Sequence, residues 1–496
     1  MKGTRESLLN QVMAWVTDSP RQKGNAYWLH GSPGIGKTSL AHSICARLHD
    51  QKRLAGAFFC RRDDPNLSEP RNILPTFINH LAVIFPPFRR VVANVLQKDP
   101  NLTAESMKYS LFLDLIRALP HDPKHSLVFV IDALDECGDD KRRPELLKIL
   151  IDVAALAPWL KVIITSRPEA DIQRFFDALH TQSMPNQYDL ATDQDASSDL
   201  RTFARSRFTS VAKKWYLPEP WPEESLFIEV ISRAAGLFVF IETVSLALEH
   251  CEDPTRFLST TLQDTAGSKP LYTLYSNILE TRITYNKGKF QSTIGVVLAT
   301  ASYRPLCEDA IATLAGVELN LVKMWMDALS SLLYRDEQAN KALRVRHLSI
   351  AEFLASDHCH HDYRANLFHA NMKLGTACLK TMIHQLRFNI CQLEDSRIAN
   401  ADMQDLPDRI KRNIPEALQY SSLYWSNHVC LAPQNGDADT WRFLREFVEG
   451  LYPLFWIEVL SVLRMVHIGV PSLRGLKSWV EVCPTPIFHL NDSNLP

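Results

Sequence analysis

The octapeptide Gly31-Ser32-Pro33-Gly34-Ile35-Gly36-Lys37-Thr38 decides the fold of this chain. It fits the pattern G-x-x-x-x-G-K-[ST], whose successive backbone N–H groups surround a phosphate. The residues before it (26–29) are apolar enough for a short buried strand, and residues 38–48 repeat apolar side chains at helical spacing. A strand, a glycine-rich loop and a helix in this order turn the loop amides and the helix N-terminus toward an anion. The pattern therefore predicts a phosphate-binding P-loop.

Each residue of this loop has an expected part in holding a nucleotide. We expect the segment from Gly31 to Gly36 to surround the phosphates, and Ser39 to continue this contact into the helix. Lys37 would reach the β- and γ-phosphates, and the Thr38 hydroxyl would bind Mg²⁺. The predicted ligands are thus a nucleotide and Mg²⁺.

The composition is typical of a folded protein with several domains. The chain has 496 residues, of which 46% are hydrophobic and 22% are charged. A net charge of −2 and a pI of about 6.8 offer no electrostatic argument for binding nucleic acid or a membrane surface. The two most apolar stretches (236–248 and 454–470) contain charged residues and are predicted to be core helices. The ten cysteines are scattered singly, which favours reduced thiols and a cytoplasmic protein.

Three further segments are predicted to be strands, at residues 54–59, 126–131 and 161–165. The second of them is a continuous, β-branched run, as expected of a strand that is buried on both faces. Residues 73–85 and 104–119 show helical spacing. Strands that alternate with helices predict an α/β fold with a parallel, doubly wound sheet through about residue 190.

Beyond the predicted sheet the pattern becomes mainly helical. A linker is predicted near residues 265–270, and a hairpin with strands at 331–334 and 342–347 is predicted among helices, which suggests a winged-helix unit. The remainder is mainly helical and shows no internal repeat that we can detect. The predicted domains are a nucleotide-binding domain (1–190), a helical domain (191–268), a winged-helix domain (269–355) and a mainly helical C-terminal domain (356–496).

A carboxylate-rich turn follows the strand predicted at 126–131. Its residues are Asp132-Ala133-Leu134-Asp135-Glu136, about 95 positions after Lys37. A P-loop needs a second acidic element that holds Mg²⁺ and orients the attacking water. We expect Asp132 to bind the Mg²⁺ shell, and either Asp135 or Glu136 to polarise the water, so that this turn forms a Walker B element. The alternative is an ordinary acidic loop after a strand.

An arginine follows the strand predicted at 161–165, in the segment Thr165-Ser166-Arg167-Pro168-Glu169. In a doubly wound sheet the carboxyl ends of neighbouring strands converge on the ligand. Arg167 is therefore predicted to contact the γ-phosphate and to act as a sensor. The alternative is a surface arginine that caps the end of the strand.

These motifs together resemble the NACHT class of STAND NTPases, and most closely the large set found in filamentous fungi. The resemblance rests on the octapeptide at 31–38, the acidic turn at 132–136 and the arginine segment at 165–169. Further segments extend it over most of residues 3–355: 3–5, 58–63, 234–239 and 271–275. It implies that the ligands are ATP and ADP, since the choice of adenine over guanine follows from the resemblance alone. The sequence carries no guanine-reading Asn-Lys-x-Asp element.

The resemblance also implies a NACHT domain followed by helical and winged-helix domains. In this family a winged-helix histidine can touch the nucleotide phosphates in the closed, ADP-bound state, and His347 stands at the matching place. An ordinary histidine at a strand end is the alternative. Gly3, Thr4 and Arg5 stand where the family approaches the adenine. The family usually carries an N-terminal effector and C-terminal ligand-sensing repeats, and we detect neither in this sequence.

Three other clusters have simpler explanations. Asp357-His358-Cys359-His360-His361-Asp362 lacks a second ligand pair at a plausible spacing, so a solvated connection is favoured over a metal site. Lys141-Arg142-Arg143 is predicted to be a solvated loop or helix start. Phe85-Pro86-Pro87-Phe88 is predicted to be a turn rather than a partner-binding loop.

The sequence as a whole predicts a signalling switch. ADP would hold the nucleotide-binding, helical and winged-helix domains closed, and exchange for Mg-ATP would open them and expose a surface for self-association. Slow ATP hydrolysis would reset the switch. Two alternatives are a constitutive P-loop ATPase and an interaction scaffold that nucleotide only stabilises.

Overall fold

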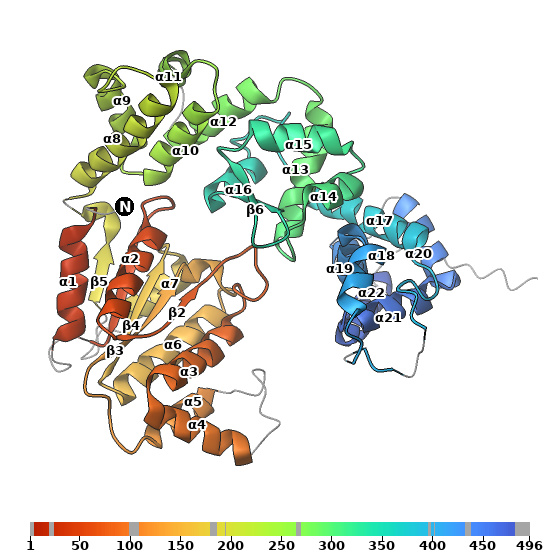
Figure 1. The fold of residues 1–496 in the computed structure, drawn as a ribbon, viewed down its shortest axis with the longest axis horizontal. Helices are drawn as coiled ribbons and strands as arrows, with labels where there is room; N and C mark the ends of the chain where they lie inside the picture. Colours follow the sequence, from red (N-terminus) through yellow and green to blue (C-terminus); the bar gives the residue numbers. More distant parts are fainter. Residues whose placement is uncertain are drawn as a thin grey trace, which may run out of the picture. The chain divides into compact units, whose positions relative to one another are not determined.

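A computed structural model describes residues 4–18, 24–98, 109–178, 186–193, 195–263, 269–394, 398–400, 402–431 and 438–481. The chain forms two compact units (Figure 1). The first unit comprises residues 1–274 together with 347–349, and the second comprises residues 275–346 and 350–496.

A five-stranded sheet forms the centre of the first unit. Its strands are β1 (Ala26–His30), β2 (Leu54–Phe59), β3 (Leu127–Asp132), β4 (Leu160–Ser166) and β5 (Asn186–Asp189). They lie in the order β2-β3-β4-β1-β5, and every neighbouring pair is parallel. The predicted parallel, doubly wound sheet is therefore confirmed, and each bound of β1 to β4 lies within one residue of its prediction.

Strand β5 lies at the edge of the sheet and was not predicted from the sequence. Its four residues, Asn-Gln-Tyr-Asp, carry no apolar alternation, and they pair only with β1 in the described sheet. A short polar edge strand is stabilised by its neighbour rather than by burial of its own side chains.

The sheet buries both faces, and β3 shows this most clearly. Val128 and Val130 pack into one hydrophobic cluster, whereas Phe129 and Ile131 pack into another. This alternation follows from the period of two in a β-strand. The first cluster is closed by α1 (Glu6–Thr17) and α2 (Lys37–Asp50). The helices that close the second lie on the other side of the sheet (Figure 1): α3 (Ile73–Ile84), α5 (Tyr109–Arg117), α6 (Arg142–Leu156) and α7 (Ala170–Ala178).

The predicted turn at 85–88 is wrong beyond its first residue. Phe85 lies directly after α3, and Pro86 begins a further helix, α4 (Pro86–Lys98). Proline suits the first helical turn, because its missing N–H has no partner to lose there. The helix predicted at 104–119 is present as α5, while residues 104–108 lie outside the described residues.

Helices follow the sheet, as predicted. They are α8 (Ala196–Trp215), α9 (Glu224–Ala234), α10 (Phe238–Glu249), α11 (Pro254–Gln263) and α12 (Pro270–Arg282). The apolar stretch 236–248 accordingly forms a core helix, α10. Of the linker predicted at 265–270, residues 265–268 lie outside the described residues, and Pro270 already begins α12.

The second unit contains the predicted hairpin among helices. Strands β6 (Leu333–Asp336) and β7 (Ala342–Val345) pair antiparallel, which confirms the hairpin, although β6 begins two residues later than predicted. The flanking helices are α13 (Lys287–Ala301), α14 (Glu308–Ala315), α15 (Leu319–Ala328) and α16 (Leu348–Ala355), and the first two residues of α16 belong to the first unit. The rest is helical: α17 (Leu367–Gln385), α18 (Leu406–Asn413), α19 (Glu416–Cys430), α20 (Ala438–Glu449), α21 (Tyr452–Val462) and α22 (Gly469–Glu481). The division into four domains stays a prediction.

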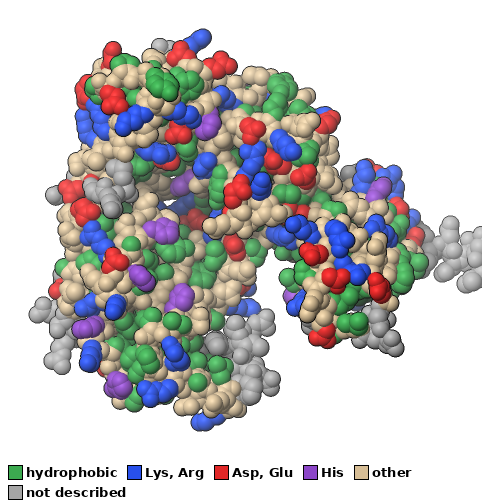
Figure 2. Space-filling model, viewed as in Figure 1, with side chains coloured by type: hydrophobic (Ala, Val, Ile, Leu, Met, Phe, Trp, Pro, Cys, Tyr) green, Lys and Arg blue, Asp and Glu red, His purple; other side chains and the backbone are tan. Residues whose placement is uncertain are grey.

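The surface in view carries charges of both signs. Figure 2 shows basic and acidic side chains interspersed, as expected from the net charge of −2. Within the described ranges, none of the helices combines the length and the apolar character that a membrane span requires.

Candidate nucleotide-binding site

The P-loop connects β1 to α2 in the first unit. Gly34 and Gly36 have φ angles of 80° and 96°, which L side chains rarely adopt. Gly36 directly precedes α2, so this conformation turns the chain into the helix. A Cβ atom on Gly34 would lie only 2.2 Å from Cγ1 of Val239. The backbone therefore requires glycine at both positions, of which Gly36 is fixed by the motif and Gly34 is not, and the helix N-terminus adjoins the loop.

The predicted ligand contacts of the loop differ in exposure. Gly31 and Ile35 are buried, while Pro33 is half-buried. Ser32, Thr38 and Ser39 are exposed. The exposed backbone and hydroxyl groups suit contact with a polar ligand, whereas the buried residues anchor the loop to the core.

The first turn of α10 packs against the P-loop. The backbone N–H of Val239 donates to the carbonyl oxygen of Gly34 at 3.2 Å. A Cβ atom on Gly36 would lie 3.8 Å from Cδ2 of Phe238. Segment 234–239 belongs to the family pattern quoted above, but no contact with the P-loop was predicted for it. Apolar residues at a helix start give no local signal for such packing.

Lys37 is held by its own loop. Its Nζ atom donates to the carbonyl oxygens of Gly31 at 2.7 Å and Ser32 at 2.9 Å. Burial lowers the Lys37 pKa to about 8, and the positive charge of Arg167 also lowers it, whereas Asp135 raises it. A phosphate beside the amine would favour the charged form and raise this pKa.

Thr38 and Asp132, the two predicted Mg²⁺ ligands, lie together. The buried Asp132 carboxylate at the end of β3 accepts hydrogen bonds from the hydroxyls of Thr38 and Thr165. Burial raises the Asp132 pKa, and the two hydroxyl contacts oppose that rise. A hydroxyl and a carboxylate oxygen are the donors that Mg²⁺ prefers, so this pair fits the metal.

Thr165 joins the ends of β3 and β4. Its hydroxyl accepts the backbone N–H of Ala133 at 3.0 Å and donates to Asp132. Ala133 has a φ of 54°, so the acidic turn begins with a left-handed residue. We missed this role of Thr165 from the sequence. The only available signal was a hydroxyl residue at a strand end, two positions before Arg167.

The buried Asp135 and the half-buried Arg167 form an ion pair. Asp135 lies in a single 3₁₀ turn (Leu134–Glu136). Its Oδ1 accepts the backbone N–H of Arg167 at 2.9 Å, and its Oδ2 lies 3.2 Å from Arg167 Nε. The Arg167 side chain is 15% exposed. The Asp135 carboxylate is therefore engaged in holding the arginine.

Glu136 has different surroundings from its neighbour. It is half-buried, and its Oε2 accepts the backbone N–H of Arg62 at a long 3.3 Å. Burial raises the Glu136 pKa above its ordinary value, and the contact with Arg62 opposes this. A raised pKa makes a carboxylate a better proton acceptor near neutral pH. Of the two alternatives for polarising water, the geometry favours Glu136.

His347 belongs to the first unit, although it follows β7 in the sequence. Its Cε1 lies 3.9 Å from the position of a Cβ on Gly34. Its Nδ1 lies 2.6 Å from the Ser349 hydroxyl oxygen and accepts the backbone N–H of Ser349 at 3.2 Å, and the second contact favours the tautomer with the ring proton on Nε2. Burial lowers the His347 pKa to about 4, and the charges of Arg167 and Lys37 add to this effect. The ring is thus a neutral hydrogen-bond donor beside the P-loop.

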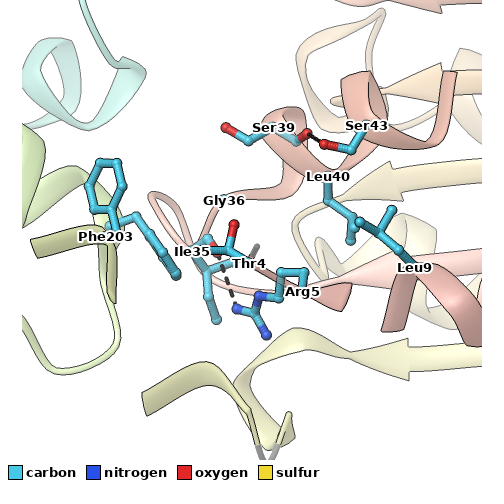
Figure 3. A pocket seen from close by; sticks show the side chains of 10 residues that line it. Thr4, Arg5, Leu9, Ile35, Gly36, Ser39, Leu40, Ser43 and Phe203 are labelled. Atoms are coloured by element: carbon cyan, nitrogen blue, oxygen red, sulfur yellow. Dashed lines mark hydrogen bonds between the residues drawn. The ribbon is translucent and has the colours of Figure 1, made fainter. Parts of the chain in front are cut away.

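A pocket lies next to the P-loop in the first unit (Figure 3). Apolar side chains, including Leu9, Phe203 and Phe238, form much of its wall, and Ser39 lines it from α2. Thr4 and Arg5 also line it, whereas Gly3, the third residue of the predicted adenine segment, lies outside the described residues. An apolar pocket beside a phosphate cradle suits a planar base.

Arg5, which lines this pocket, also forms polar contacts with α8 and with the P-loop. Its backbone N–H donates to Oδ2 of Asp199 in α8 at 2.8 Å, and its guanidinium forms an ion pair with Asp193. Its Nη2 also donates to the carbonyl oxygen of Ile35 in the P-loop at 3.4 Å (Figure 3). The N-terminal segment, the P-loop and α8 therefore share one polar contact network.

The histidine-rich segment set aside from the sequence lies in the second unit. Ligand atoms of His360, His361 and Asp362 lie within 4.8 Å of one another, and both histidines are exposed. The Lys287 ammonium lies 2.9 Å from Asp362 Oδ2. A metal cation would have to compete with this lysine, and the solvated connection stays a prediction.

One family model matches the N-terminal third of the chain. Residues 3–167 match the family model described as Nephrocystin 3, N-terminal. This match covers about a third of the chain and includes the P-loop, the acidic turn and Arg167. No curated protein matches the chain. A P-loop NTPase fold implies nucleotide binding in general, while the predicted fungal origin stays a prediction.

Several solved structures resemble the chain at low identity. A STAND protein with a tetratricopeptide repeat sensor from Pyrococcus horikoshii is 15% identical over 96% of this chain and 64% of its own, with a TM-score of 0.38. A Walker-type ATPase of Pyrococcus abyssi is 14% identical over 71% and 95%, with a TM-score of 0.32. Cdc6p from Pyrobaculum aerophilum is 12% identical over 69% and 89%, with a TM-score of 0.33. The chain thus spans less than two thirds of the P. horikoshii protein.

Proposed function

We propose that this chain is a nucleotide-dependent signalling switch of the STAND/NACHT kind. It binds ADP or ATP with Mg²⁺ and hydrolyses ATP slowly. Its nucleotide state governs domain opening and self-association. The observation that carries the proposal is the presence of Lys37, Arg167 and His347 around one P-loop, because the last of them comes from a distant part of the sequence.

The chemistry of hydrolysis divides among the described residues. Thr38 and Asp132 would hold Mg²⁺, which neutralises phosphate charge when bound. Lys37 would bind the β- and γ-phosphates, and Arg167 would leave part of its contact with Asp135 to bind the γ-phosphate. Glu136 would accept the proton of the attacking water, since its raised pKa suits that role.

His347 supports the switch rather than a simple ATPase. A neutral ring with its proton on Nε2 can donate one hydrogen bond to a phosphate without adding charge. Such a contact favours the state in which residues 347–349 adjoin the P-loop. A change in the ratio of closed to open molecules from 1:99 to 99:1 requires a ligand to bind the two states with affinities that differ by about 5.5 kcal/mol. Lys37, Arg167 and His347 together would supply it.

The first test is the nucleotide released when the purified protein is denatured. We expect near-stoichiometric ADP from the wild type and none from Lys37→Ala, because that substitution removes the ammonium that contacts the phosphates. Lys148→Ala, an exposed lysine of α6, is the matched control and should retain ADP. Chromatography of the released nucleotide measures all three.

Other outcomes would point elsewhere. A wild type that carries no ADP and turns ATP over steadily above about 1 per second would favour a constitutive ATPase. A wild type that binds neither nucleotide would contradict the proposal.

A further inference from the structure

Arg143 differs sharply from its neighbour in the basic run 141–143. Both Arg142 and Arg143 lie in the first turn of α6, but their side chains are 47% and 12% exposed. Arg142 reaches Glu69 and Asp139 on the surface. The expectation that the run is solvated is therefore wrong for Arg143, whose side chain turns inward.

Arg143 connects two elements on either side of the candidate site. Its Nε donates to Oδ2 of Asp171 at 2.7 Å, and the Asp171 side chain is 7% exposed. Its Nη1 donates to the backbone carbonyl oxygens of Asp135 at 3.2 Å and Gly138 at 3.4 Å. Asp171 lies in the first turn of α7, four residues after Arg167. One guanidinium thus joins the acidic turn to the helix that follows the sensor arginine.

The backbone of Asp135 is held from a second direction as well. Arg62, which follows β2, donates from Nη2 to the same Asp135 carbonyl oxygen at 3.2 Å. The Asp135 carboxylate at the same time holds Arg167. A carbonyl oxygen has two lone pairs, so Arg62 and Arg143 can both donate to it. The position of Glu136, the next residue, follows from these contacts.

We infer that Arg143 and Asp171 form a positioning pair for ATP cleavage. Resting on the proposed function, this inference assigns to the pair the alignment of Glu136 and Arg167, with no contact to the nucleotide itself. A rigid guanidinium fork can bind a carboxylate and a carbonyl at once, which a lysine ammonium on a flexible stem does not reproduce. Removing either partner leaves a largely buried charge without its counter-ion.

The positioning role predicts a separation of rate from binding. Arg143→Ala should lower kcat by about tenfold to a hundredfold, as expected of a small misplacement of reacting groups. KM for ATP and Kd for ADP should change less than about twofold, because the P-loop contacts remain. Arg142→Ala is the matched control and should retain the wild-type kcat. Single-turnover ATP hydrolysis and ADP titration on the full chain measure these quantities.

Two further variants distinguish positioning from structural support. The double variant Arg143→Ala/Asp171→Ala should be no slower than Arg143→Ala, because the two side chains act as one unit. Arg143→Lys should restore the melting temperature while leaving kcat low, since it keeps the charge but loses the fork. Recovery of both quantities by Arg143→Lys would overturn the inference.

The remaining outcomes separate this inference from the proposed function. Equal kcat in Arg143→Ala and wild type overturns the inference alone. Parallel losses of kcat, ADP affinity and melting temperature also overturn it, because they indicate a purely structural pair. A wild type that binds ADP yet cleaves no ATP overturns both the inference and the proposed hydrolysis.

Discussion

Asp135 and Glu136 are adjacent in sequence but have different surroundings. The Asp135 carboxylate holds the backbone and the guanidinium of Arg167, whereas Glu136 is half-buried with one long contact to a backbone N–H. Burial raises the Glu136 pKa. A group that already anchors an arginine is poorly placed to take a proton from water. At the scale of single residues, the two carboxylates therefore have different expected roles.

Replacement of Glu136 tests this division. Glu136→Gln should lower the rate of ATP cleavage by about 10²-fold or more, the usual contribution of a general base. ADP affinity should stay within about twofold, because the P-loop is untouched. Single-turnover hydrolysis and ADP titration measure both. Glu145→Gln, an exposed glutamate of α6, is the matched control. Cleavage at the wild-type rate in Glu136→Gln would assign the base elsewhere.

At the scale of elements, α17 and α19 share a buried polar network in the second unit. His428 of α19 is fully buried. Its Nδ1 lies 2.7 Å from Oδ1 of Asn371, and its Nε2 lies 2.7 Å from the hydroxyl of Tyr420. The amide oxygen requires a proton on Nδ1, so Nε2 accepts from the tyrosine. Burial lowers the His428 pKa to about 3, and the ring is neutral when the helices are packed.

This network predicts acid sensitivity of the second unit. The folded-state pKa of His428 lies below the unfolded value of about 6.5. The unfolded chain therefore gains a proton first as the pH falls, and stability is lost progressively from about pH 6.5 downward, by about 2 kcal/mol at pH 5. Thermal melts at pH 7 and pH 5 measure this loss.

The two matched variants each replace one histidine, His428 on α19 or His384 on α17. His428→Gln should lower the melting temperature at pH 7 but flatten its fall toward pH 5. His384→Gln, at an exposed position of α17, should melt like the wild type at both pH values. An unchanged pH slope in His428→Gln would show that another group governs the acid response.

At the scale of the whole molecule, the proposed switch predicts that size depends on nucleotide. With Mg-ADP we expect a compact monomer, and with a non-hydrolysable ATP analogue we expect an opened chain or an oligomer. The reason is that the phosphate contacts of Lys37, Arg167 and His347 change with the γ-phosphate. Light scattering coupled to gel filtration measures this, with Lys37→Ala as the variant that should not respond. Identical hydrodynamic size in both nucleotides would exclude the switch.

Local patterns in the sequence were enough to predict the centre of the first unit. Strands β1 to β4, the P-loop and the acidic turn have apolar runs, glycines and carboxylates at fixed spacing, and each bound of these strands was predicted within one residue. These features can be recognised in the sequence because a buried parallel strand requires apolar residues and a left-handed backbone conformation favours glycine. The polar β5 has no such requirement and was missed.

The tertiary structure alone decided which side chains meet. Arg62 follows β2, Arg143 lies in the first turn of α6, and Arg167 follows β4. All three nevertheless contact Asp135. No spacing in the sequence distinguishes Arg143 from the exposed Arg142, because the difference lies in which way a helix turn faces. The sequence by itself determined the phosphate-binding loop and its strand context. The division of work between Asp135 and Glu136 depends on partners brought together by the sheet, and long-range packing is what sets those partners.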